Sequence, residues 1–250
     1  VRKFHIATDE EIKAGKTTDV YFVRTRRILK AKGMDKLTAT AEVTASGLPR
    51  DWRWAVLCGV EEVARLLEGY PVDVDCLPEG TIFRAHDAKG RRLPVLTIRG
   101  RYADYCELET PLLGLLCQAS GVATMAARIR KLAWDKTLLA FGIRRAHPAL
   151  APMLDRATYI GGFDGVSSLV GAEAIRKKPM GTMPHSLIIC FGPPNPLTPL
   201  EYLLVERNLP ILKIESAIKY IELYLAERER EDIFRVKRIK KKLELRARAT

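Results

Sequence analysis

The sequence lacks closely spaced metal ligands. Its five cysteines stand singly, no Cys-x-x-Cys pair occurs, and the four histidines lie far apart. Structural zinc sites are built from closely spaced Cys and His ligands, so these absences argue against one. The odd number of cysteines and their apolar neighbours instead predict buried free thiols in a reducing compartment.

Long hydrophobic runs are also missing from the pattern. The apolar run from Leu112 to Cys117 stops at Gln118, whereas a membrane-spanning helix needs about 20 predominantly apolar residues. The residues that follow Val1 are charged and carry no apolar signal-peptide core. We therefore expect a cytoplasmic protein that does not cross a membrane.

The composition is that of a folded protein with a basic surface. The chain has 250 residues, of which 47% are hydrophobic, enough for one large domain or two modest ones. A net charge of +12 suits a polyanionic partner, either nucleic acid or phosphate-rich small molecules. A solvated basic surface, as in heat-adapted proteins, explains the same charge. Composition therefore leaves the partner open.

Residues 1–108 predict a mixed α/β domain. Apolar positions at helical spacing between Gly59 and Gly69 indicate a helix. Asp87 to Gly90 is typical of a turn. β-branched or alternating runs indicate strands at Leu37 to Thr44, Val72 to Cys76, Thr81 to Phe83 and Val95 to Ile98. The segment therefore predicts a small sheet backed by helices.

The pattern changes within residues 109–192. We expect a long helix from Glu109 to Lys131, in which Gly121 and its small neighbours allow another element to approach closely. Its buried face is expected to carry Leu113, Leu116, Ser120, Ala123 and Ala127. Strand–helix repeats follow. The first is a strand at 138–142 with a helix at 148–157, and the second is a strand at 159–165 with a helix at 167–176. A third strand ends at 180–182, before a helical run that begins at His185. This alternation predicts the first three units of an incomplete parallel (β/α) barrel, with functional residues at the carboxyl ends of its strands.

Three polar segments accompany these units: Phe141 to Pro148 with Arg144 and Arg145, Tyr159 to Gly165 with Asp164, and Gly181 to Ser186 with His185. Adjacent arginines after a buried strand are costly unless an anion pairs with them. A structural salt bridge satisfies any one arginine equally well, and a lone histidine at a turn is more often structural. The combination of all three segments favours a site.

These segments resemble the short archaeal-type nicotinate phosphoribosyltransferases, members of the type II phosphoribosyltransferase family. The resemblance extends to Asp19–Phe22 with Arg24 and Thr25, Pro78–Thr81, Gly100–Tyr102 and Glu109–Thr124, and covers residues 1–192. It implies formation of nicotinate mononucleotide and pyrophosphate from nicotinate and phosphoribosyl pyrophosphate, with ATP and Mg²⁺ as co-substrates, in NAD biosynthesis. Related quinolinate-using enzymes share the architecture, but the segment around His185 favours nicotinate.

The resemblance also implies roles for individual residues. His185 matches the histidine that ATP phosphorylates, and Arg144 matches an arginine at the reacting centre. Among substrate-binding positions, Tyr21 matches the aromatic residue that stacks on nicotinate across a dimer interface, so a homo-oligomer is expected. The remaining substrate-binding matches are Arg145, Thr182, Ser186 and Asp164, the last expected to hold an arginine in place.

The resemblance ends near Gly192, after which the remaining 58 residues contain no glycine. Residues 193–250 read as a proline-rich linker, an amphipathic helix over Glu215–Asp232 and a basic end over 234–250. One hypothesis is a change of reading frame near Gly192, which would leave a truncated and inactive enzyme. The alternative is a remodelled, non-catalytic protein that binds nucleic acid or a protein partner; nucleic-acid contact is the less favoured interpretation of the basic end.

Overall fold

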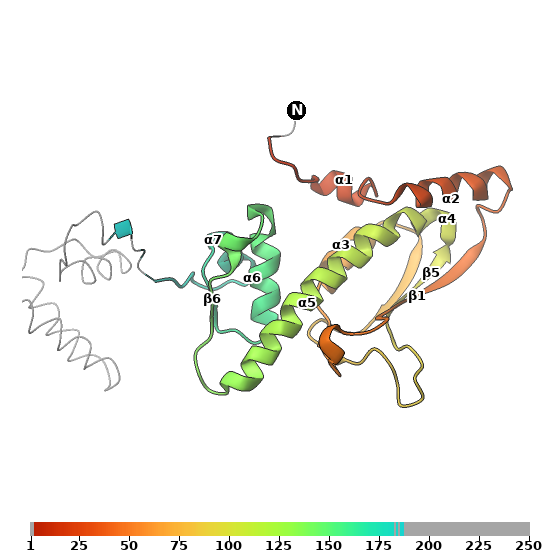
Figure 1. The fold of residues 1–250 in the computed structure, drawn as a ribbon. Coiled ribbons are helices and arrows are strands. Elements are labelled where there is room, and N and C mark those ends of the chain that lie inside the picture. Colours follow the sequence, from red (N-terminus) through yellow and green to blue (C-terminus); the bar gives the residue numbers. More distant parts are fainter. Residues whose placement is uncertain (1–2, 183, 185, 188–250) are drawn as a thin grey trace, which may run out of the picture. The chain divides into compact units, whose positions relative to one another are not determined.

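The computed structural model describes residues 3–182, 184, 186 and 187 of the 250-residue chain. The chain divides into two compact units, Val1–Gly181 and Thr182–Thr250. The architecture given by the described residues is therefore that of the first unit (Figure 1). The linker, amphipathic helix and basic end expected within 193–250 lie outside the described residues.

The first unit is mixed α/β, as the sequence predicts. Its helices are α1 (Asp9–Lys13), α2 (Val20–Ala31), α3 (Val60–Leu67), α4 (Tyr102–Tyr105), α5 (Glu109–Ala133), α6 (Ala151–Ile160) and α7 (Leu169–Ala174), with the 3₁₀ turns η1 (Pro49–Asp51), η2 (Cys106–Leu108), η3 (Ile143–Arg145) and η4 (Pro148–Leu150). Its strands are β1 (Thr38–Thr44), β2 (Ala55–Val56), β3 (Val72–Cys76), β4 (Ile82–Phe83), β5 (Pro94–Arg101), β6 (Leu139–Ala140) and β7 (Gly165–Val166). The helices α1 and α2 had not been predicted.

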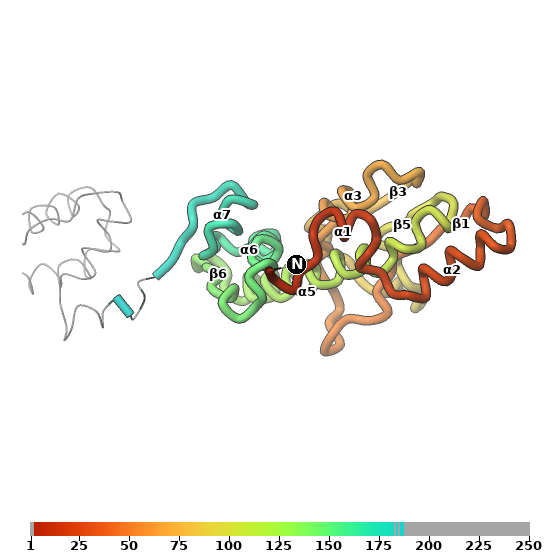
Figure 2. The backbone as a smooth tube through the Cα atoms, turned by 90° about the horizontal axis from the view of Figure 1, so that it is seen from above, coloured from red at the N-terminus to blue at the C-terminus, as the bar shows by residue number. Residues whose placement is uncertain are grey.

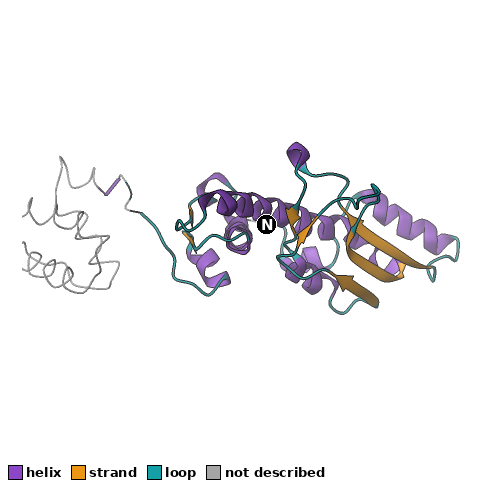
Figure 3. Cartoon of the chain, turned by 90° about the horizontal axis from the view of Figure 1, so that it is seen from below, coloured by secondary structure: helices purple, strands orange, loops and turns teal. Residues whose placement is uncertain are grey.

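The N-terminal part is built on an antiparallel sheet in the order β1-β5-β3, with β2 and β4 forming a separate antiparallel pair. In the central strand β5, Leu96 and Ile98 are buried while Arg99 is exposed, which is the alternation of a sheet with one covered face. Figure 3 shows helices lying beside this sheet. The four predicted strands and the helix at 59–69 are confirmed in this region.

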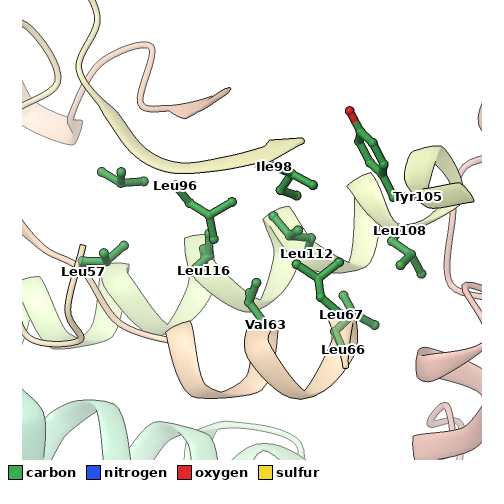
Figure 4. Packing of buried hydrophobic residues seen from close by; sticks show 11 residues of the cluster. Leu57, Val63, Leu66, Leu67, Leu96, Ile98, Tyr105, Leu108, Leu112 and Leu116 are labelled. Atoms are coloured by element: carbon green, nitrogen blue, oxygen red, sulfur yellow. The ribbon is translucent and has the colours of Figure 1, made fainter. Parts of the chain in front are cut away.

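The long helix α5 links this sheet to the C-terminal elements of the first unit. Leu112 and Leu116 on its N-terminal half pack with the buried side chains of the sheet and α3 (Figure 4). Ala119 and Ala123 on its middle turns pack with Val56 and with Ala157 of α6. One helix therefore contributes to both hydrophobic clusters.

The expected buried face of α5 is partly wrong. Leu116 and Ala123 are buried, but Leu113 is 46% exposed and Leu112 occupies the core instead. The observed rotation of α5 directs two hydroxyl groups toward β2. Thr124 Oγ1 accepts from the Val56 N–H at 2.8 Å, and Ser120 Oγ accepts from the Cys58 N–H at 2.9 Å. These bonds satisfy backbone donors of β2 and its following turn, which would otherwise be buried without partners.

Gly121 does not provide the expected close approach. An added Cβ would meet nothing within 4 Å there, whereas at Gly59 it would contact the backbone of Leu115. Gly59 also has a φ of +96°, which an L side chain rarely adopts. The close packing of α5 against its neighbours therefore depends on Gly59, Ala119 and Ala123.

Two further expectations need correction. The helical stretch Tyr102–Ala133 is long and apolar enough to cross a membrane, with a mean hydropathy of 1.4 in its best window, so the expectation that the sequence lacks such a stretch is wrong. In the first unit 33% of that window is buried, packed against the sheet and α6. The four described cysteines are free, and Cys58 and Cys106 are buried; Cys76 is only half-buried, however, and Cys117 is exposed.

The C-terminal elements of the unit form the β/α repeat with shifted boundaries. β6 and β7 pair in parallel, Leu139 opposite Gly165 and Ala140 opposite Val166. Tyr159 lies in α6, and the strand begins only at Gly165, so the strand predicted for 159–165 is wrong. The Met180 N–H donates to the Val166 carbonyl at 2.8 Å, which places a third extended segment beside β7.

Candidate active site

The carboxyl edge of the β6–β7 pair brings together segments that are far apart in the sequence. β6 leads into η3, which contains Arg144 and Arg145, and β7 leads into Ser167. The carboxyl edge of parallel strands is where ligands of α/β proteins commonly bind, because turns and helix N-termini converge there. The pair thus places two arginines and a serine after neighbouring strands.

Arg144 and Arg145 are both exposed. Within residues 3–182 neither guanidinium group donates a hydrogen bond or forms an ion pair. The 3₁₀ turn is held by its own backbone, with the Arg145 N–H donating to the Gly142 carbonyl at 3.1 Å. The salt bridge that would make either arginine purely structural is therefore not present in the described part of the chain.

Ser167 and Ser168 were not singled out from the sequence. Ser168 begins α7: its hydroxyl accepts from the Gly171 N–H at 2.9 Å and donates to Asp155 of α6. Asp155 is only 1% exposed and fixes this turn from within the core. Ser167 is half-buried and makes no hydrogen bond within the described residues. The signal for this arrangement was Asp155, the one acidic residue in positions 143–163.

Asp164 lies at the opposite edge of the strand pair from Arg144, because it precedes β7. Its Oδ2 accepts from Arg130 at 2.5 Å and from the Leu138 N–H at 2.7 Å. The Leu138 N–H and the Arg130 guanidinium hold the pKa of the Asp164 carboxyl below its usual value. The expectation that Asp164 lies at a strand's carboxyl end is wrong, and Arg130 is the arginine that it holds.

Arg130 itself was missed in the sequence. Besides Asp164 it donates to the carbonyl groups of Gly162 at 2.6 Å, Lys136 at 2.8 Å and Trp134 at 3.1 Å. These carbonyls belong to the two loops that enter β6 and β7. One guanidinium group therefore joins both strand entrances.

A second arginine joins α6 to the N-terminal part of the unit. Arg156 donates to Glu79 and to Glu61, each at 2.8 Å. Glu79 also accepts from the N–H groups of Gly59 and Glu61, at 2.8 and 3.0 Å. Burial raises the pKa of the Glu79 carboxyl, but the hydrogen bonds from Arg156 and the two N–H groups outweigh it, so the pKa is lowered.

Tyr21 is separated from the arginines of the same chain. It lies in the first turn of α2 and is 55% exposed, with its ring 4.3 Å from that of Phe22. The turn is tied to α5 because Thr110 Oγ1 donates to Asp19 at 2.9 Å. Figures 1 and 2 show α2 and β6 at opposite ends of the first unit. The structure does not bring Tyr21 and Arg144 together within one chain.

The remaining predicted residues belong to the second unit. Thr182 and Ser186 are both exposed, and Ser186 is helical. His185 lies outside the described residues. In the described ranges, up to residue 187, no cluster of three or more His, Cys, Asp or Glu side chains forms a metal site.

Comparison with known proteins gives a consistent set of relatives. Residues 19–120 match the family model for the quinolinate phosphoribosyl transferase N-terminal domain. The nicotinate phosphoribosyltransferase of Rattus norvegicus is 35% identical over 200 residues, which are 77% of this chain and 35% of that protein. That of Mycobacterium tuberculosis is 29% identical over 199 residues, 71% of this chain and 44% of the relative.

Two solved structures share the fold. Nicotinate-nucleotide pyrophosphorylase from Pyrococcus furiosus is 51% identical with a TM-score of 0.76, covering 86% of this chain and 52% of that one. Human nicotinic acid phosphoribosyltransferase is 26% identical with a TM-score of 0.62, covering 69% and 40%. The chain thus spans about a third to a half of the length of these four relatives. Over about three quarters of its own length, this chain is therefore similar to nicotinate phosphoribosyltransferases.

Proposed function

We propose that the protein transfers a phosphoribosyl group to nicotinate in NAD biosynthesis, releasing pyrophosphate. The ring nitrogen of nicotinate forms the new bond to C1 of the ribose, while the bond from C1 to the pyrophosphate oxygen breaks. Both substrates are anions, and charge builds up on the departing pyrophosphate. The reaction therefore needs fixed positive groups more than it needs a nucleophile on the protein.

The observation that carries this proposal is the pair of guanidinium groups that follow β6 and have no partner among the described residues. A guanidinium donates in a planar fork that fits a carboxylate or a phosphate, and Arg144 and Arg145 stand exposed at the edge of the parallel pair. In this proposal Arg144 binds the phosphoribosyl pyrophosphate, and Arg145 the nicotinate carboxylate or a neighbouring phosphate. Ser167 directly follows the neighbouring strand β7 and lies at the same carboxyl edge of the strand pair.

The other roles are proposed from the resemblance. Tyr21 stacks on the nicotinate ring of a second copy, in a homo-oligomer. Thr182 and Ser186 bind substrate, and His185 accepts a phosphoryl group from ATP, whose Mg²⁺ arrives with the nucleotide. For Asp164 we propose support of the strand entrance through Arg130 in place of substrate contact. We further propose that β6 and β7 begin a (β/α) barrel, and that the free thiols belong to a cytoplasmic protein.

The experiment is an assay of pyrophosphate release that depends on both nicotinate and phosphoribosyl pyrophosphate, run in parallel with quinolinate. Arg144→Ala is expected to lower kcat/KM at least about a hundredfold, the usual cost of removing a group that stabilises developing charge. The matched control is Arg99→Ala, which removes an exposed arginine on β5 and its surface pair with Asp75. Equal activity of the two variants would contradict the assignment of Arg144, and preference for quinolinate would contradict the substrate.

A further inference from the structure

A hairpin arm between β4 and β5 carries an unusual concentration of positive charge. Residues 84–93 form it, with four Arg or Lys side chains and one histidine against the single acid Asp87. Backbone hydrogen bonds between Asp87 and Arg91 and between Ala85 and Leu93 hold the two strands together. Between them, His86 and Arg92 form an antiparallel β-bridge. Figure 1 shows this arm projecting from the sheet ahead of β5. It is an ordered structure, with Gly90 at φ +77° closing its turn.

The cations are sorted between the two faces of this hairpin. Asp87 accepts from Arg91 Nε at 2.7 Å, so one acid and one base neutralise each other on one face. His86 lies opposite Arg92, and Arg84 lies two residues before His86, so all three share the other face. Arg84 and Arg92 are exposed and form no ion pair among the described residues. Two like charges at diagonal positions of a hairpin repel each other, so an anion on this face would be stabilised.

Planar groups lie in the segment before β2, the strand that pairs with β4 at the base of the hairpin. β2 pairs with β4 with Ala55 opposite Phe83, and the next residues of the two strands are Trp54 and Arg84. The Arg128 guanidinium of α5 stacks over the rings of Trp52 and Trp54, at 4.0 and 4.5 Å from their centroids. Its Nε is buried and has no hydrogen-bond partner within the part of the chain that the structure describes. Trp52 is half-buried, so part of this stack reaches the surface.

We propose that Arg84, His86 and Arg92, together with Trp52, form a binding face for single-stranded nucleic acid. The two arginines pair with successive phosphates, and the indole of Trp52, backed by Arg128, stacks on a base. Paired phosphate contacts and planar stacking are the two requirements for holding a single strand without sequence preference. An acidic polypeptide would use the charges but not the stack, so the observations favour nucleic acid. The chain's net charge of +12 adds long-range attraction.

The face lies outside the proposed active site and differs from the basic end at 234–250. The test is the fluorescence anisotropy of a labelled single-stranded oligouridylate with the full chain at increasing salt. The variant Arg84→Glu/Arg92→Glu is compared with Arg27→Glu/Lys30→Glu, which changes two exposed cations of α2 and shifts the net charge equally. Thermal unfolding of both checks that they fold.

We expect Arg84→Glu/Arg92→Glu to weaken binding at least about tenfold near 100 mM salt and to reduce the salt slope by about 1.4, since each phosphate contact contributes about 0.7 on a single strand. Trp52→Ala weakens binding at least about fivefold, and the α2 variant stays within about twofold of the parent chain. Pyrophosphate release is unchanged in the hairpin variant. Four results would overturn the proposal: no binding, equal loss in both double variants, loss only when 234–250 is removed, or equally tight binding of polyglutamate.

Discussion

Arg130 of α5 and Asp164, which directly precedes β7, form an ion pair that closes the entrance of both parallel strands. The same guanidinium holds three backbone carbonyls in the two loops. Arg130→Ala is therefore expected to lower the free energy of unfolding by about 2 kcal/mol, because those carbonyls lose the guanidinium donor that they share. Arg130→Lys restores part of it, since an ammonium cannot reach all four acceptors. Urea unfolding measures both changes. Unaltered stability in Arg130→Ala would contradict the role of this clamp.

Acid should weaken the connection between α6 and the N-terminal part through Glu79. The pKa of this carboxyl is lowered from its ordinary value of 4.5 in the folded state. Its contribution to stability is therefore complete above the unfolded pKa and is lost as the pH falls through the folded pKa. Unfolding free energies between about pH 3 and 6 are expected to fall less steeply in Glu79→Gln than in the parent chain. The control is Glu42→Gln on the exposed side of β1. Parallel curves for all three proteins would refute the prediction.

The described thiols should differ sharply in reactivity. Burial, followed by the contact with Glu79, raises the pKa of Cys58 to about 12, so almost no thiolate exists at neutral pH. Cys106 is buried, whereas Cys117 is exposed on α5. Mass spectrometry after brief alkylation of the native protein is expected to show modified Cys117 and unmodified Cys58 and Cys106. Unfolding in urea should make Cys58 and Cys106 reactive as well. Early labelling of Cys58 would mean that its turn opens readily.

If Tyr21 serves a second copy, complementation should reveal it. Tyr21→Ala and Arg144→Ala are each expected to be inactive. Mixing them under refolding conditions creates hetero-oligomers in which one site has both residues intact. For random dimers about a quarter of the parent activity should return, because half of the dimers are mixed and each has one complete site of two. Absence of recovery, with mixed oligomers demonstrated by a size tag, would place both residues in the same copy.

Ser167 offers a test of the edge shared with Arg144. Ser167→Asp puts a carboxylate beside the proposed anion site, and we expect the KM of the anionic substrates to rise at least about tenfold. Ser167→Ala removes only a hydroxyl group and should change KM less. Ser46→Asp, on an exposed loop, is the matched control for the added charge. If Ser167→Asp behaves like Ser46→Asp in steady-state kinetics, Ser167 lies outside the site.

The sequence by itself determined the local elements whose pattern is strong. β3 was predicted with its observed bounds, and α5 to within two residues, because alternation and helical spacing record which side chains face a core. It also marked Arg144 and Arg145, since adjacent charges after an apolar strand stand out in any pattern. The segment around Gly162 was misassigned because glycines before a short strand resemble a strand with a turn.

Only the tertiary structure decided which residues meet. The rotation of α5 toward Leu112 depends on backbone donors of β2 accepted by Ser120 and Thr124, which no helical spacing reveals. Asp164 and Arg130 are 34 positions apart, and nothing local to either shows that they pair. The direction of each strand also decided which residues share an edge of the sheet. Arg144 follows β6 whereas Asp164 precedes β7, so these two residues lie at opposite edges of the parallel strand pair. Long-range contacts arise from packing, and packing is a property of the folded chain.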